Sequence, residues 1–160
     1  MDRIDRSILE LLQNDCTMPV AEIARRVGLS TTPCWRRIQK LEEEDVICER
    51  VALLSPYKLN VGLTVFMTVK ASRHTSAWAD DLKSRVENAP QIIELHRLSG
   101  GGNDYLLRFV VRDVAEFDQL QRQLMDEVEF ADVSTSICLE SMKRTTKLPL
   151  SNLISPDGNE

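Results

Sequence analysis

The sequence has no continuous apolar run of the roughly 18 to 20 residues that a membrane-spanning helix needs. Its first 15 residues are charged from position 2 onward and lack the apolar core of a secretory signal peptide. Its four cysteines form no C-x-x-C pair and no cluster with the two histidines, which argues against a zinc module or a disulfide framework. These absences predict a cytoplasmic protein with free thiols, no membrane association and no metal site.

The residue sets of common enzymes are also missing. No paired carboxylates, Ser/His/Asp set or metal cluster occurs at motif spacing, so nothing predicts a catalytic residue or a cofactor. The formal net charge of −5 argues against a protein that coats nucleic acid indiscriminately. A local basic face is still compatible with this charge, because phosphate attraction falls off within about 8 to 10 Å.

The first third of the chain contains three amphipathic segments. Residues 3–14 have apolar side chains at helical spacing, and Asp2 can cap that helix. Pro19 and Gly28 delimit a second short helix, and Ser30 is a suitable N-cap for a third. The apolar side of the third helix is predicted to comprise Cys34, Trp35, Ile38 and Leu41. Two short helices joined by a glycine turn, after a supporting helix, predict a helix-turn-helix.

The next stretch marks a domain boundary. The run "VICERVALLS" is typical of one or two short strands, enough for the wing of a winged helix-turn-helix and a connecting strand. "PYKLNVG" then interrupts the pattern with a proline and a glycine. We expect a winged helix-turn-helix domain over 1–50, a connecting strand and linker over 51–61, a second domain over 62–146 and a tail over 147–160.

The second half alternates between strand and helix patterns in the order β-α-β-β-α-β. Strands are predicted at 63–71, 91–98, 104–111 and 131–142, and helices at 76–89 and 113–127. This order is typical of a ferredoxin-like α+β fold, with a four-stranded antiparallel sheet and helices on one face. Covering the other face of the sheet would require a partner, which favours a homodimer.

Three consecutive glycines separate the two middle strands, in the stretch "RLSGGGNDYLL". A nucleotide-binding P-loop would need Gly-Lys-Ser/Thr leading into a helix, whereas this run lacks the lysine and leads into a strand. Glycine readily adopts the positive φ of a hairpin turn. Bare backbone N–H groups could also hold the carboxylate of a small ligand, so a plain turn and a ligand site are both open.

Four stretches, in this order, resemble the Lrp/AsnC family of regulators: "DRIDRSILELLQND", "VAEIARRVGLSTTPCWRRIQKLEEEDVI", "VALLSPYKLNVGL" and "GGNDYLL". The resemblance covers roughly residues 2–146. It implies a winged helix-turn-helix that binds double-stranded DNA, followed by a ligand-sensing domain, in homodimers that assemble into octamers. The implied function is sequence-specific transcriptional regulation, modulated by a small effector, an amino acid, that is bound at the interface of the C-terminal domain. The alternative is a nucleoid-architectural protein that wraps DNA without a ligand.

The resemblance also implies site residues. It puts a DNA-facing surface on the third helix, at Ser30, Thr31, Thr32, Arg36, Arg37 and Lys40. Of these, Arg36 suits bidentate contact with guanine, whereas Arg37 and Lys40 suit phosphates. It puts an effector site on the hairpin and the last strand, at Gly100, Gly101, Gly102, Asn103, Asp104, Tyr105, Ser134, Thr135 and Ser136.

The chemistry of the hairpin fits an amino acid. Asp104 or backbone carbonyls could receive the ammonium group, and the glycine backbone the carboxylate. The hairpin is one residue longer than the family's common pattern, so the identity of the ligand does not carry over. Cys16, within "NDCT", is similar to a cysteine-responsive branch, which makes sulfur amino acids the first ligands to consider. Cys34, by contrast, is predicted to pack in the core.

Overall fold

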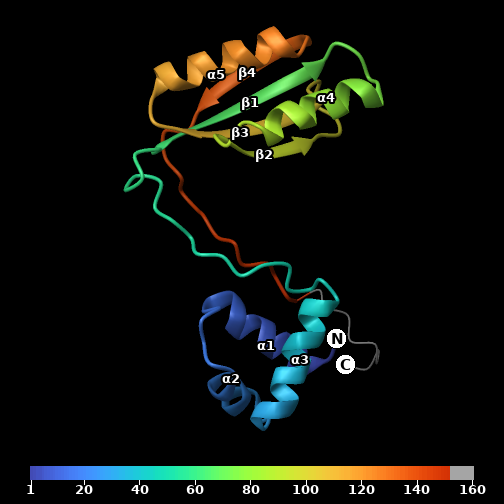
Figure 1. Cartoon of the computed structure of the whole chain (residues 1–160), viewed down its shortest axis with the longest axis vertical. Helices are drawn as coiled ribbons and strands as arrows, with labels where there is room; N and C mark the ends of the chain where they lie inside the picture. The colour runs from blue at the N-terminus through green and yellow to red at the C-terminus, as the bar shows by residue number, and fades with distance from the viewer. Residues whose placement is uncertain (152–160) are drawn as a thin grey trace. The chain divides into compact units, whose positions relative to one another are not determined.

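A computed structural model describes residues 1–151, which form two compact units (Figure 1). The first unit contains Met1–Ala52 and the segment that begins at Lys143, and the second contains Leu53–Met142. Residues 143–151 thus pack with the N-terminal helices, whereas the sequence predicted residues 143–146 in the second domain and the following residues in a tail. Residues 152–160 of that predicted tail lie outside the described residues.

Three helices build the N-terminal unit, as the sequence predicts: α1 (Arg3–Asn14), α2 (Val20–Val27) and α3 (Thr31–Glu43). Asp2 caps α1 with its side chain, and Gly28 ends α2 in the left-handed conformation at φ +73°. Ser30 occupies the N-cap of α3. The core between the helices consists of Ile8, Leu9, Leu12, Ile23, Ala24, Cys34, Ile38 and Leu41.

One residue of the predicted apolar side lies elsewhere. Trp35 is 50% exposed, whereas its neighbour Cys34 is fully buried. One residue turns an α-helix by about 100°, so Trp35 lies at the edge of the side that faces the core. The prediction was right for Cys34, Ile38 and Leu41 and wrong for Trp35.

The C-terminal segment of the first unit binds to the end of α1. The Gln13 side chain accepts the Leu148 N–H at Oε1, at 2.6 Å, and donates from Nε2 to the Leu148 carbonyl, at 3.2 Å. Lys147 Nζ contacts Asn14 Oδ1, and Leu150 packs against the helical core. A side-chain amide therefore satisfies both backbone groups of Leu148 in a segment that has no regular structure.

The predicted wing strands are not formed in the described structure, where residues 44–62 contain no strand. Val51, Leu53 and Leu54 in this stretch are all more than 60% exposed. A strand is stable only when a neighbouring strand accepts its backbone hydrogen bonds, and this segment pairs with no strand of the chain that the structure describes. The residues have the strand propensity that the sequence indicates, but no strand within residues 1–151 pairs with them.

The second unit has the predicted ferredoxin-like topology. Its elements are β1 (Leu63–Ala71), α4 (Ser76–Glu87), β2 (Ile92–Arg97), β3 (Tyr105–Val111), α5 (Val114–Glu127) and β4 (Phe130–Ile137). The strands form an antiparallel sheet in the order β2-β3-β1-β4. The last strand was predicted to reach residue 142 but ends at Ile137.

The two faces of the sheet differ in burial. Alternate residues of β1 and β3 point to α4 and α5 and form the core, which includes Val65, Met67, Val69, Leu107, Phe109, Val111, Leu82 and Phe117. The intervening residues point to the opposite face, where Phe66, Leu106 and Val110 are only partly covered. The period of two along each strand explains why one face is buried and the other is not.

Candidate DNA interface and effector pocket

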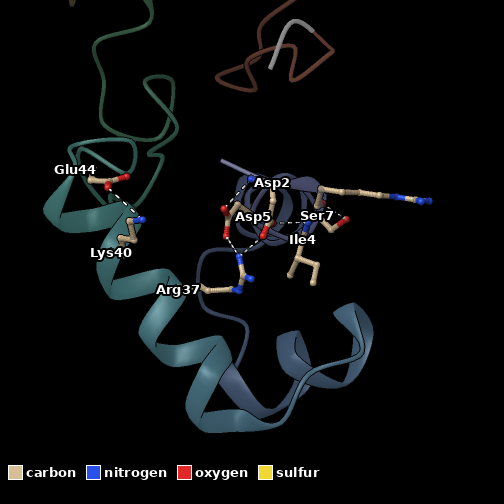
Figure 2. Close-up of polar contacts among 8 residues, drawn as sticks. Asp2, Ile4, Asp5, Ser7, Arg37, Lys40 and Glu44 are labelled. Carbon is tan, nitrogen blue, oxygen red and sulfur yellow. Dashed lines mark hydrogen bonds and ion pairs between the residues drawn. The ribbon is translucent and has the colours of Figure 1, made fainter. Parts of the chain in front are cut away.

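The exposed side of α3 carries the predicted basic residues. Cys34, Ile38 and Leu41 face the core, so helical spacing puts Arg36 and Lys40 on the solvent side. Arg36 has no ion-pair partner among the described residues, and Lys40 Nζ lies 3.6 Å from the exposed Glu44 (Figure 2). An exposed pair of this length is weak, so Lys40 can exchange it for a phosphate.

The start of α3 is also exposed. Ser30, Thr31 and Thr32 all lie at the surface, and the described structure has no capping hydrogen bond from the Ser30 side chain. Their hydroxyl groups are therefore accessible, next to the backbone N–H groups of a helix N-terminus. Five of the six predicted DNA-facing residues thus lie on the exposed surface of α3 and its N-cap.

Arg37 has a different environment. Its Nη1 donates to Asp2 Oδ2 and to Asp5 Oδ1, both at 2.7 Å, as Figure 2 shows. The hydrogen bonds to Asp5 and Asp2 raise the pKa of the Arg37 guanidinium above its usual value. This arginine is thus neutralised within the protein, against the N-terminus of α1. Its partners are more than 30 positions away in sequence, so no local pattern distinguishes Arg37 from the exposed Arg36.

The arginines of α2 are also paired. The Glu22 carboxylate accepts hydrogen bonds from Arg25 and Arg26, with N···O distances of 2.7 to 2.9 Å. These hydrogen bonds, from Arg25 first and then Arg26, lower the pKa of Glu22 to about 2. One carboxylate facing two guanidinium groups leaves α2 with a net positive charge near the turn into α3.

The cysteines do not assemble into a site. All four are free, and only Cys34 is buried. Burial raises the pKa of the Cys34 thiol, which makes it a packing residue with little thiolate character, as predicted. Among residues 1–151, no group of three or more His, Cys, Asp or Glu side chains could hold a metal ion. None of the described helices combines the length and apolarity needed to cross a bilayer.

The glycine run forms the turn between β2 and β3. Gly100, Gly101 and Gly102 have φ values of +86°, +78° and +85°, all in the left-handed region. No atom within 4 Å would obstruct a Cβ at any of them, so the backbone conformation alone explains the glycines. A side chain there would cost about 1 to 2 kcal/mol per position. The tip is exposed.

Asp104 lies where three strands meet. Its backbone N–H donates to the Val69 carbonyl at 2.9 Å, and its carbonyl accepts the Leu98 N–H at 2.7 Å. Its carboxylate Oδ2 accepts the Ala71 N–H at 2.8 Å and lies 3.8 Å from His74 Nδ1. In the described structure Oδ1 has no hydrogen-bond partner, and 28% of the side chain is exposed. Oδ2 therefore stabilises the junction with β1, and Oδ1 is available to a ligand.

Asp104 lines a cavity of about 260 Å³ on the helix side of the sheet. The other lining residues are Ala71, Arg73, His74, Thr75, Ser76, Ala79, Arg97, Leu98 and Tyr105. A carboxylate and two arginines around one small cavity match the two charges of a free amino acid. The cavity is smaller than the roughly 300 to 1,000 Å³ of pockets for drug-sized ligands, which also favours a small metabolite.

The structure separates the predicted effector residues. Asp104 and Tyr105 line the cavity, whereas the three glycines, Asn103 and the β4 residues do not. Asn103 donates to Thr68 Oγ1 at 3.2 Å. The residue opposite Thr68 on β4 is Ser134, and Ser136 lies opposite Phe66, so both serines point to the open face of the sheet. Thr135, opposite Met67, alternates to the helix side.

Arg73, His74 and Arg97 line the cavity although they were not predicted as site residues from the sequence. Arg97 could have been found, because it pairs with Tyr105 across the hairpin and a hairpin turn brings its flanking residues together. Arg73 and His74 precede α4, and nothing in their local sequence indicates that β1 and α4 bring them to Asp104.

Comparison with known proteins agrees with this architecture. Residues 1–42 match the AsnC-type helix-turn-helix domain, and residues 64–148 match the Lrp/AsnC ligand binding domain. The chain is 41% identical over 150 residues to the glutamate uptake regulatory protein of Zymomonas mobilis, an alignment that covers 94% of this chain and 91% of that protein.

Two crystal structures are similar over nearly the whole chain. An AsnC family transcriptional regulator from Agrobacterium tumefaciens is 47% identical, with a TM-score of 0.91, over 96% of this chain and all of its own. A transcriptional regulator from Neisseria meningitidis in complex with L-methionine is 32% identical, with a TM-score of 0.90, over 96% of this chain and 99% of its own. The chain therefore belongs to the Lrp/AsnC family of DNA-binding transcriptional regulators.

Proposed function

We propose that this regulator reads DNA with the exposed side of α3, through Ser30, Thr31, Thr32, Arg36 and Lys40. The observation that carries this proposal is the exposed Arg36, whose guanidinium is unpaired among the described residues while the neighbouring Arg37 is paired. A guanidinium on a helix in the major groove can donate two hydrogen bonds to a guanine. Lys40 adds a phosphate contact one turn later, and the hydroxyl groups at the start of the helix add others. With DNA as its partner, the protein would act in the cytoplasm.

The effector in this proposal is a free amino acid held in the Asp104 cavity. Asp104 Oδ1 would accept the ammonium group, and Arg73 or Arg97 would pair with the carboxylate. Ala71, Ala79 and Leu98 would leave an apolar space for a small side chain. The methionine bound to the regulator from Neisseria meningitidis supports an amino acid, and a sulfur-containing one is the first to test. Cysteine and methionine are therefore the leading candidates.

A homodimer is also part of the proposal, with assembly to an octamer as its extension. The open face of the sheet presents Phe66, Leu106 and Val110, each only partly covered. On the same face Arg108 pairs with Glu94 at 2.7 Å, and the Arg108 Nε is buried without a partner in the described structure. Three partly covered apolar side chains beside a partly buried arginine, whose Nε has no partner among the described residues, fit association with a second copy.

Replacing Phe66 with lysine is expected to convert the dimer to a monomer, because Phe66 lies directly opposite Arg108 and the ammonium would be buried at the interface beside this like charge. Size-exclusion chromatography with light scattering measures the mass directly. Met125→Lys, a similar change at an exposed position of α5, serves as the control and should leave the assembly intact. An unchanged mass for a folded Phe66→Lys protein would rule out this face as the interface.

Fluorescence anisotropy tests whether an amino acid changes the affinity of the protein for DNA. The labelled DNA is a duplex that the protein has selected from a random library. Each amino acid is added in turn at fixed salt, because affinity for DNA depends strongly on salt. One amino acid is expected to shift the affinity roughly 5- to 150-fold, which corresponds to a coupling of about 1 to 3 kcal/mol. Tight binding that no amino acid changes would contradict the sensing role and favour ligand-independent wrapping of DNA.

A further inference from the structure

Arg37 lies on α3 beside the exposed basic residues, yet its guanidinium faces α1 (Figure 2). Its side chain is 33% exposed, and its partner Asp5 is only 15% exposed. Nη1 carries two N–H groups, and the geometry allows one to each carboxylate, at 2.7 Å in both cases. The ion pair with Asp5 is thus partly buried between two helices, where its geometry is more constrained than that of a surface pair.

The carboxylates that bind Arg37 also cap α1. Asp2 Oδ1 accepts the N–H groups of Ile4 and Asp5 at 2.9 Å, and its Oδ2 accepts Arg37. Asp5 Oδ2 accepts the Asp2 N–H at 2.9 Å, and its Oδ1 accepts Arg37. Each carboxylate therefore uses one oxygen for the capping box and the other for α3. The N-terminus of α1 and the middle of α3 are joined through one closed network.

We propose that Arg37 is a positioning residue, which holds α3 at a fixed orientation against the cap of α1 and makes no contact with DNA itself. This inference rests on the proposed DNA-reading role of α3. Its physical basis is that Arg36 and Lys40 can meet bases and phosphates together only if the helix is held in one orientation. We refer to the contacts among Asp2, Asp5 and Arg37 as the cap clamp.

The cap clamp also affects the local charge. Asp2 and Asp5 line an open groove of about 510 Å³ together with Arg36, Arg37 and Lys40. Without Arg37, two carboxylates would remain beside the two cations that are proposed to meet DNA. Loss of Arg37 therefore weakens DNA binding both through orientation and through repulsion, so this variant alone cannot separate the two effects.

The variant Asp5→Asn distinguishes a positioning role of Arg37 from a phosphate contact, because the two roles predict opposite changes in the affinity for DNA. Asparagine keeps an oxygen for the Asp2 N–H, so the capping box survives, but its NH₂ group cannot accept from Arg37. If Arg37 is a positioning residue, Asp5→Asn weakens binding to the selected duplex about tenfold. If Arg37 contacts phosphate, Asp5→Asn leaves its guanidinium with one carboxylate partner, Asp2, in place of two and removes a negative charge, so binding becomes tighter.

The experiment measures the Kd of the full-length chain for the selected duplex and for an unrelated duplex at one salt concentration. If Arg37 is a positioning residue, Arg37→Ala should weaken binding to the selected duplex about tenfold or more, and by a larger factor than binding to the unrelated duplex, because the orientation of α3 matters for base contacts. A phosphate contact would instead weaken binding to both duplexes by the same factor. Because both changes break one network, the Asp5→Asn/Arg37→Ala protein should bind about as weakly as Arg37→Ala alone.

Two controls make the result decisive. Glu10→Gln removes an exposed carboxylate from the same helix and should not weaken binding; within residues 1–151 this carboxylate pairs with Arg6 alone, at 3.0 Å. Arg36→Ala tests the DNA-reading surface itself: if it leaves specific binding unchanged, the proposed function fails at that step. If Arg36→Ala weakens binding while a folded Asp5→Asn protein binds normally or more tightly, only the positioning role is overturned. Should Arg37→Ala not fold, Asp5→Asn still decides the question.

Discussion

Arg36→Ala is expected to lower affinity for the selected duplex roughly 5- to 150-fold, the range for one bidentate contact between arginine and guanine of about 1 to 3 kcal/mol. Affinity for an unrelated duplex should fall much less, because there Arg36 contributes at most one phosphate contact. The ratio of the two affinities should therefore collapse. Anisotropy titrations with both duplexes at one salt concentration measure this ratio.

The expectation for Arg36 depends on its surroundings. Arg36 lies two residues after the buried Cys34, on the exposed side of α3. Its guanidinium forms no ion pair with the described residues, so alanine would remove none. Alanine should therefore leave the fold intact. Arg122→Ala, at an exposed i,i+4 pair with Asp118 on α5, removes the same charge far from the helix-turn-helix in sequence. If both variants reduce the two affinities equally, Arg36 contributes net charge only and does not read bases.

Asp104→Asn is expected to abolish the response to the effector while leaving DNA binding without effector unchanged. The amide oxygen can still accept the Ala71 N–H, so the junction of β1 and β3 is retained. The ammonium group loses a charged acceptor worth about 1.5 to 3 kcal/mol, which lowers effector affinity roughly 10- to 150-fold. At an effector concentration that just saturates the unchanged protein, the variant is therefore largely unoccupied, and an effector that is not bound cannot shift the affinity for DNA.

Isothermal titration calorimetry measures the affinity for the effector, and DNA titrations with and without effector measure the shift in DNA affinity. Asp126→Asn, at an exposed position of α5, is the matched control and should keep the effector affinity and the shift unchanged. Asparagine is preferable to alanine at Asp104, because alanine would leave the buried Ala71 N–H without an acceptor. A response that survives in Asp104→Asn would move the effector site away from this cavity. The open face near Asn103, Thr68 and Ser134 would then be the next location to test.

Much of the fold followed from the sequence, because its signals are local. Asp2, Gly28 and the 3.6-residue period of apolar side chains predicted the first helices to within a residue or two. The period of two in residues 63–71 predicted β1 with its observed bounds. The wing prediction failed because a strand depends on a partner, and the end of β4 was misplaced because strand propensity continues beyond the last pairing on β1.

By itself, the sequence determined the helix-turn-helix, the ferredoxin-like order and the family, and it predicted the two regions where we propose that DNA and effector bind. Each depends on residues close together in the chain, whose spacing reports helix, strand and turn directly. Only the tertiary structure decided which side chains meet. It paired Arg37 with Asp2 and Asp5, and it brought Arg73 and Arg97 to Asp104. Those contacts join residues from different elements, and their distances arise from packing, which no local pattern encodes.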